Sequence, residues 1–349
     1  MVIQLTQGVN KQHEITNPGP LLRDGILREP GWARKPLLEY NRDQIQSGWW
    51  RIKEWDYYAV LTEKYGVTFT FTDLGILGLI NITWLDFTNQ TFIVSEDFKL
   101  LTRGNLDLPS SSLDGDLVYE GKHLKLSILN DQGNRKIIFK DLKFDGDTKI
   151  SGELIIKKPK NQESMVIATP WKDVHGKFYY NRKLNCLPTQ GEVTLGNEIY
   201  EFNPSTAYTV LDWGRGVWPY NNTWYWGSAS GTVDGVPVGF NIGYGFGDLS
   251  KATENIIFYD GIGHKLDQVT FEFDEGDYLK IWKFTSTDGR FEMTMEPILD
   301  RNATVNLLIF KSIQHQVFGK FSGTLILDDG TKVEITNMIG FAEKVVNRW

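Results

Sequence analysis

The stretch Trp224–Phe246, which reads WYWGSASGTVDGVPVGFNIGYGF, decides the fold because it specifies a hairpin. Asp234-Gly235 is typical of a two-residue β-turn between antiparallel strands. With Val233 opposite Val236, the turn fixes the pairing along both strands. One set of pairs is Gly231–Val238, Ala229–Phe240, Gly227–Ile242 and Tyr225–Tyr244, and the alternate set is Ser230–Gly239, Ser228–Asn241, Trp226–Gly243 and Trp224–Gly245.

This register gives the hairpin two different faces. One is apolar and carries Tyr225, Ala229, Val233, Val236, Val238, Phe240, Ile242, Tyr244 and Phe246. The other carries Trp224, Trp226, Ser228, Ser230 and Asn241 beside a row of glycines at 239, 243 and 245. Glycine inside a strand indicates that another group comes close. That group is either the two indoles, which cover cross-strand glycines, or a ligand on an aromatic floor with polar anchors.

The residues before the hairpin are rich in tryptophan and poor in charge. Four of the twelve tryptophans lie between residues 211 and 226, where the only charges are Asp212 and Arg215. We expect a turn over Leu211–Tyr220, with glycine at 214 and 216. A carboxylate and a guanidinium in such surroundings are costly unless they are paired or functional. They therefore form either a buried salt bridge that pins the turn, or a site in which Asp212 transfers a proton and Arg215 orients it.

The rest of the chain is predicted to be β-structure. Residues alternate with period two in Val67–Asp73, and related runs follow at Ile76–Phe87, Leu124–Ile128, Lys136–Phe139, Lys149–Lys157 and Thr324–Thr336. We expect a loop-rich N-terminal extension over residues 1–45 that packs on two β-barrels or sandwiches, 46–188 and 189–349. The Lys-, Asn- and Pro-containing segment Asn161–Pro188 is expected to cross between them.

Composition excludes several classes of function. A net charge of −7 gives no reason to expect nucleic acid as a partner. The single cysteine, Cys186, rules out an intrachain disulfide or a cysteine-based zinc cluster. The five histidines are scattered, and the Asp-Gly-Asp triplets at 114–116 and 145–147 read as turns, so we expect no metal and no cofactor.

The N-terminal residues contain no apolar signal region, and no run of eighteen apolar residues occurs. These features predict a soluble, cytoplasmic protein without an integral membrane segment. The sequence carries no signal for an oligomeric state.

Several motifs together resemble the family called domain of unknown function 2804. They are WDYYAVL (55–61), PGWARKPLLEYNR (30–42), DWGRGVWPYNNTWYWGSASG (212–231), NIGYGFGD (241–248), TENIIFYDG (253–261) and the ending GTLILDDGTKVEITNMIGFAEKVVNRW (323–349). That family resembles, more distantly, tandem lipocalin-like proteins such as carotenoid hydratases and tocopherol cyclases. The resemblance implies an all-β chain of two lipocalin-like (calycin) antiparallel barrels with a chamber for a large hydrophobic substrate.

Three functions remain open at this point. The first is an acid-assisted hydratase, cyclase or isomerase of a hydrophobic or amphipathic small molecule, such as a lipid or isoprenoid. The second is a non-catalytic lipid- or pigment-binding protein, and the third is a carbohydrate-binding or glycan-processing protein in which Asp212 and Glu254 approach each other across a cleft. The candidate catalytic residues are Asp212, Arg215 and Glu254. The candidate substrate-binding residues are Trp213, Trp218, Tyr220, Trp224, Trp226, Ser228, Asn241, Tyr244, Asn255 and His264.

Overall fold

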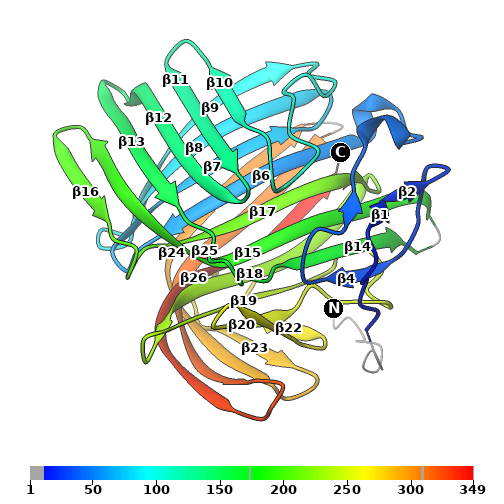
Figure 1. The fold of residues 1–349 in the computed structure, drawn as a ribbon. Helices are drawn as coiled ribbons and strands as arrows, with labels where there is room; N and C mark the ends of the chain where they lie inside the picture. The colour runs from blue at the N-terminus through cyan, green and yellow to red at the C-terminus, as the bar shows by residue number, and fades with distance from the viewer. Residues whose placement is uncertain (1–11, 173, 308–309, 349) are drawn as a thin grey trace.

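The chain forms two large, curled antiparallel sheets that pack face to face (Figure 1). The computed structural model describes residues 12–172, 174–307 and 310–348. The described residues form an all-β fold of two curled half-barrels in tandem, as the sequence predicts. Helical structure in the described residues consists of the 3₁₀ segments η1 (Arg42–Gln44) and η2 (Trp49–Arg51). None of the described helical segments is long and apolar enough to cross a membrane.

The first sheet runs in the order β10-β11-β12-β13-β15-β17-β6-β7-β8-β9, with β14, β16 and β4 paired at its side. Its strands are β6 (Ile52–Leu61), β7 (Tyr65–Asp73), β8 (Leu77–Asp86), β9 (Thr91–Leu100), β10 (Leu117–Glu120), β11 (Leu124–Asp131), β12 (Asn134–Asp145), β13 (Thr148–Ile156), β14 (Met165–Trp171), β15 (Val174–Leu195), β16 (Glu198–Phe202) and β17 (Tyr208–Val217). The sheet curls until β9 meets β10 and β12, where Tyr119 donates to Asp97 and Ser95 donates to Asp141.

The second sheet runs in the order β21-β20-β19-β18-β26-β25-β24-β23-β22. Its strands are β18 (Asn221–Val233), β19 (Val236–Tyr244), β20 (Ile256–Tyr259), β21 (Ile262–Lys265), β22 (Val269–Glu272), β23 (Trp282–Ser286), β24 (Phe291–Leu307), β25 (Phe310–Ile326) and β26 (Lys332–Arg348).

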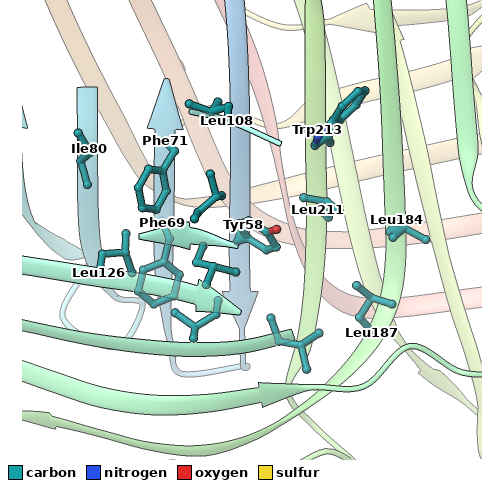
Figure 2. Packing of buried hydrophobic residues seen from close by; sticks show 14 of the residues in the cluster. Tyr58, Phe69, Phe71, Ile80, Leu108, Leu126, Leu184, Leu187, Leu211 and Trp213 are labelled. Atoms are coloured by element: carbon teal, nitrogen blue, oxygen red, sulfur yellow. The ribbon is translucent and has the colours of Figure 1, made fainter. Parts of the chain in front are cut away.

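Each sheet buries one apolar face inside its own curl. In the first half-barrel this interior includes Tyr58, Phe69, Phe71, Leu126 and Trp213, which Figure 2 shows on the same side of the strands. The second half-barrel has a separate interior that includes Phe240, Ile242 and Phe284. Two further buried clusters, one around Trp218 and Phe246 and one around Trp226 and Phe341, lie between the sheets. The interface between the half-barrels is therefore aromatic.

The described part of the N-terminal extension packs on both sheets. Its strands are β1 (Gly19–Pro20), β2 (Leu22–Arg23), β3 (Ile26–Leu27), β4 (Gly31–Ala33) and β5 (Leu38–Glu39). Strand β4 pairs with β14 of the first sheet, and Gln12 hydrogen-bonds to Thr253 and Leu266 of the second half. The extension thus connects the two half-barrels.

The predicted register of the Trp224–Phe246 hairpin is confirmed from Val233–Val236 to Tyr225–Tyr244, including Trp226–Gly243. The last predicted pair, Trp224–Gly245, is not formed because β19 ends at Tyr244 and Gly245 adopts a φ of 91°. For the same reason Phe246 leaves the apolar face and enters the cluster between the sheets.

Two other expectations differ from the structure. Residues 161–188, expected as a crossover, contain β14 and the first part of β15. The expected boundary at 188/189 falls inside β15, which pairs with β14 and β17 before this point and with β13 and β16 after it. The change of sheet comes later, between Val217 and Asn221.

Candidate active site between the two sheets

Strand β17 presents Asp212 and Arg215 on opposite faces. Side chains alternate along a strand, so residues three apart point to opposite sides. The Lys183 ammonium lies 2.8 Å from Asp212, whereas Arg215 Nη2 lies 2.9 Å from Asp56 inside the first half-barrel. The expected Asp212–Arg215 pair is therefore wrong.

The expected turn over Leu211–Tyr220 is also wrong, because residues 208–217 form a continuous strand. Its glycines serve close packing. The Trp55 ring occupies the space where Gly214 would carry a Cβ, and the Phe178 carbonyl does the same at Gly216. The face that carries Asp212 and Gly214 can therefore approach other groups closely.

Asp212 is the centre of a buried polar cluster on the face toward the second sheet. Asn181 Nδ2 donates to its Oδ1 at 2.5 Å, while Lys183 binds its Oδ2. The Lys183 ammonium also lies 3.8 Å from the ring centroid of Trp226. Lys183 and Asp212 have side-chain exposures of 3% and 9%. The two sheets thus meet through an ion pair and a cation–π contact.

The second sheet orients its tryptophan through an amide. Trp226 Nε1 donates to Asn241 Oδ1 at 2.7 Å, and Asn241 Nδ2 donates to the main-chain oxygen of Glu254 at 2.8 Å. Since a buried indole N–H needs a partner, Asn241 fixes Trp226 beneath Lys183. Trp226 and Asn241, on the predicted polar face of the hairpin, therefore contribute to the interface between the sheets.

The glycine row accommodates side chains other than the indoles. A Cβ at Gly243 would lie 2.5 Å from Glu254 Oε1, and a Cβ at Gly239 would lie 2.6 Å from Cys186 Sγ. Cys186 is placed there by an irregularity in β15 between Leu184 and Leu187, at which it adopts a φ of 56°. A carboxylate thus approaches Gly243 and a thiol approaches Gly239, whereas the main-chain oxygen of Thr223 approaches Gly245.

Glu254 is a buried acid with an unsatisfied oxygen. Glu254 is 6% exposed, and its Oε2 has no hydrogen-bond partner in the described structure. Burial raises the pKa of Glu254 above its ordinary value; Lys183 opposes the rise, and the Asp212 carboxylate adds to it. A neutral carboxylic acid is the form that this environment favours.

A third acid, Glu343 on β26, lies in the same interface. It accepts hydrogen bonds from Trp224 Nε1 at 2.9 Å and from Gln316 Nε2 at 3.2 Å. Gln316 in turn accepts from the Tyr57 hydroxyl and from Arg301. Burial raises the pKa of Glu343 to about 7, and Asp212 contributes in the same direction.

The three acids form one electrostatic unit. Glu254, Asp212 and Glu343 all raise the pKa of the buried Tyr179 hydroxyl, which burial already places well above its ordinary value. Among the described residues, Lys183 is the one cationic side chain that forms an ion pair with any of the three acids. Carboxylates that share so little compensating charge compete for protons.

An aromatic cluster adjoins the acids. Phe246 packs edge-on against four rings at centroid distances of 4.7 to 5.1 Å, those of Trp171, Tyr179, Trp218 and Trp224. It stands between Gly245 and Gly247, which have φ values of 91° and 84°. We call Gly245–Gly247 the plug.

The predicted site residues are distributed as follows. Asp212, Glu254, Trp224, Trp226 and Asn241 meet between the sheets, and Trp218 joins them through Phe246. Ser228 lies beside them and accepts from Asn185. Asn255, the residue after Glu254, accepts a hydrogen bond from the Gly243 amide and donates one to the main-chain oxygen of Asp267.

The other candidates lie elsewhere. Arg215 and Trp213 face the interior of the first half-barrel, and Tyr244 stacks on Tyr225 toward the interior of the second. His264 pairs with Asp328 on the outer part of β21, and Tyr220 is 37% exposed between β17 and β18. The structure does not bring these five side chains into the site.

Sequence reasoning missed Asn181, Lys183, Tyr57, Gln316 and Glu343. A usable signal exists for two of them. In β26 Glu343 takes the same alternate phase as the buried Phe341 and Val345, and in β15 Lys183 takes the phase of Tyr179. A charged residue on the buried phase of a strand is costly unless it is paired, which marks it as a candidate.

One small pocket lies between the sheets. A pocket of about 10 Å³, lined by residues that include Ala59, Val210, Ser228 and Phe341, is room for about one water molecule. In the described part of the chain, no group of three or more His, Cys, Asp and Glu side chains is arranged to hold a metal ion.

Comparisons with known proteins give a family match and a likeness of fold. A family model described as Domain of unknown function (DUF2804) matches residues 12–349, and a comparison with curated proteins gave no match. A protein assigned as AttH from Nitrosomonas europaea has a TM-score of 0.51 and 14% identity over 88% of this chain and 96% of that chain.

Two further structures have lower scores. Kievitone hydratase from Nectria haematococca has a TM-score of 0.48 and 11% identity, covering 84% and 88% of the two chains. CghA with Sch210972 has a TM-score of 0.44 and 11% identity, covering 85% and 88%. The AttH likeness supports the fold alone.

Proposed function

The chain belongs to the family called domain of unknown function 2804, and from its site we propose that it binds a hydrophobic or amphipathic small molecule between its two sheets and transfers a proton to it. The observation that carries this proposal is the buried, unpartnered Oε2 of Glu254 beside the Asp212–Lys183 pair. A carboxyl group whose pKa is raised by burial holds its proton more tightly than an exposed one and can act as a general acid.

The proposed chemistry is acid-assisted addition or rearrangement at a carbon–carbon double bond. Glu254 gives its proton to one carbon, and positive charge develops on the other. The π faces of Trp224 and Trp226 stabilise that charge. Water then adds to the cation, an internal nucleophile closes a ring, or a neighbouring carbon loses a proton. In each case one proton is released and returns to the glutamate, so the reaction is redox-neutral.

In this proposal the role of acid passes from Asp212 to Glu254. Asp212 is held by Lys183 and Asn181, and it keeps the ammonium over Trp226. We assign Asp212 and Lys183 as positioning residues that set the local field. Arg215 has no part in the site because it lies on the other face of β17.

Substrate entry requires the aromatic packing to open. Phe246 covers Trp218 and Trp224, and it is carried by two glycines in the left-handed region. Such a segment can change its backbone angles at little steric cost. We propose that movement of the plug admits the substrate to the acids.

The test has two steps. The purified protein is extracted with organic solvent, and bound compounds are identified by mass spectrometry. Those that contain double bonds are then incubated with the protein in deuterium oxide. We expect one deuterium on carbon per product molecule with the wild type, and none with Glu254→Gln, which retains binding. Unchanged turnover by Glu254→Gln, or product without carbon-bound deuterium, would contradict the proposal.

The non-catalytic alternative rests on one observation. The indole N–H groups of Trp224 and Trp226 already donate hydrogen bonds to Glu343 and Asn241, so neither group is left to bind a ligand. A pure binding protein would release the same compound unaltered and introduce no deuterium. The same internal bonding leaves few polar groups for the hydroxyls of a sugar, which places the glycan hypothesis last.

A further inference from the structure

The interior of the first half-barrel contains buried side chains of both charges. Four guanidinium groups lie there, from Arg42, Arg135, Arg182 and Arg215. Four carboxylates lie on the same face. Glu54 pairs with Arg42 and Asp56 pairs with Arg215, whereas Asp73 and Asp141 accept hydrogen bonds from other groups, which include Thr102 and Ser95. Among the described residues, neither Arg135 nor Arg182 forms an ion pair with a carboxylate. Buried charges normally require such a partner.

Arg135 and Arg182 meet at one residue. Arg135 Nη2 donates to the main-chain oxygen of Ser112 at 2.8 Å, and Arg182 Nη1 donates to the same oxygen at 3.2 Å and to Ser112 Oγ at 3.1 Å. Both arginines are 2% exposed. Burial together with the neighbouring Arg135 lowers the pKa of Arg182 to about 9. Two like charges are thus held together by neutral oxygens.

Three further donors in this interior have no acceptor. They are Arg42 Nη2, Arg215 Nε and Trp213 Nε1, all buried. The sheet register places Trp213 between Arg182 and Asp56, and it places Arg215 opposite Glu54. Arg215 also lies over the Trp213 ring, 4.1 Å from its centroid. The unsatisfied groups are therefore neighbours, and all of them are N–H donors.

An irregular segment supplies oxygens to these arginines. Residues 101–116, between β9 and β10, are called the strap here. Its Pro109 carbonyl accepts from Arg215 Nη2 at 2.8 Å, while its Ser112 carbonyl accepts from Arg135 and Arg182. Main-chain oxygens bring only partial negative charge, so they compensate the charges of Arg135 and Arg182 less than a carboxylate would.

We propose that the interior of the first half-barrel is a binding site for an oxyanion, a carboxylate or phosphate group, which Arg182, Arg135 and the Arg215–Trp213 pair hold in place of strap oxygens. Guanidinium groups match the planar, bidentate geometry of such anions. The site lies on the opposite face of β17 from Asp212, so it is independent of the proposed proton transfer.

Isothermal titration calorimetry at constant ionic strength tests this site with sodium decanoate and inorganic phosphate as probes, and with decan-1-ol as the neutral control. We expect one equivalent of at least one anion to bind, and decan-1-ol not to bind at the same position. Decanoate binding alone identifies a carboxylate carried by an apolar chain, and phosphate binding identifies a phosphate group.

The variants separate this site from the other parts of the protein. Arg182→Gln should weaken the anion at least about tenfold, because it removes charged hydrogen bonds. If Arg182→Gln does not fold, Arg182→Lys is the substitute. It keeps the positive charge but loses the planar guanidinium that can donate two parallel hydrogen bonds, so it should also weaken anion binding. Arg290→Gln, which alters a peripheral pair with Asp328, and Glu254→Gln should bind as the wild type does. Absence of anion binding, equal binding of decan-1-ol, or wild-type affinity in a folded Arg182 variant would overturn the proposal.

Discussion

Asp212 and Arg215 lie three residues apart on β17 and pair on opposite sides of one sheet, Asp212 with Lys183 and Arg215 with Asp56. The strand therefore separates two buried networks. The network between the sheets contains three acids and an aromatic wall, and the network inside the first half-barrel contains the arginines. Each should respond to substitution without disturbing the other.

The first prediction concerns this separation. Asp212→Asn leaves the Lys183 charge buried without a carboxylate, and it should lower the free energy of unfolding by about 3 kcal/mol. Lys183→Met in the same chain should recover part of the loss, because the uncompensated charge is removed. Arg215→Lys should add to Asp212→Asn within about 0.5 kcal/mol. Urea unfolding of the single and double variants measures the coupling free energy of Asp212 with Lys183 and with Arg215. A larger coupling with Arg215 would show that the two buried networks are not separate.

The second prediction concerns pH and Glu343. Its pKa is about 7 in the folded protein against an ordinary 4.5, because burial disfavours the carboxylate. Between pH 4.5 and 7 the folded state keeps a proton that the unfolded state releases, so stability falls as pH rises. The fall should amount to about 3 kcal/mol. Unfolding at pH 4.5, 6 and 7.5 should show that Glu343→Gln loses this component, whereas an identical pH profile in the variant would exclude it.

The third prediction has the opposite sign and a different pH window. Burial lowers the pKa of Lys53 from 10.5 to about 7, with Arg51 adding to the effect. Above pH 7 the unfolded state binds a proton that the folded state has released, so stability should rise between pH 7 and 10.5. Lys53→Met should flatten this rise while leaving the Glu343 window intact. A variant that retains the full alkaline rise would show that other groups cause it.

The fourth prediction concerns the plug. Phe246→Ala removes the ring that four aromatic side chains contact, so it should cost about 3 kcal/mol and make tryptophan fluorescence more sensitive to acrylamide. Phe98→Ala, at a ring that is 50% exposed on β9, is the matched control and should change neither property strongly. Unaltered quenching in Phe246→Ala would show that the ring does not shield the tryptophans.

Gly247→Ala tests the backbone of the plug. A Cβ at this residue would clash with the Thr169 methyl group, and the φ of 84° disfavours any side chain. The left-handed conformation alone costs about 1–2 kcal/mol for alanine. Thermal unfolding should therefore show a lower midpoint than that of Gly235→Ala, where the left-handed φ is similar and the surroundings are open.

The hairpin could be predicted from sequence because its information is local. Asp234-Gly235 defines the turn, and the period of two then assigns each side chain to a face. The same alternation places Asp212 and Arg215 on opposite faces once residues 208–217 are recognised as a strand. Glycines at 214 and 216 suggested a turn, and only the tertiary structure shows that Trp55 and the Phe178 backbone occupy the space above them.

The partners of the site could not be predicted because they come from distant strands. Lys183 and Asn181 reach Asp212 from β15, and Glu343 reaches Trp224 from the last strand. No local pattern states which faces of two sheets will meet. The buried phase of Glu343 and Lys183 marks them as unusual, but pairing them with Asp212 and Glu254 requires the packed half-barrels.

The central proposal is that Glu254 is the proton donor between the two sheets. Infrared difference spectroscopy of wild type against Glu254→Gln at pH 7 tests it most directly, because a carboxylic acid and a carboxylate have distinct carbonyl bands. We predict that the wild type shows a protonated carboxyl band that shifts in deuterium oxide and is missing from Glu254→Gln. Loss of a carboxylate band instead, with no difference in the carboxylic acid region, would contradict the account.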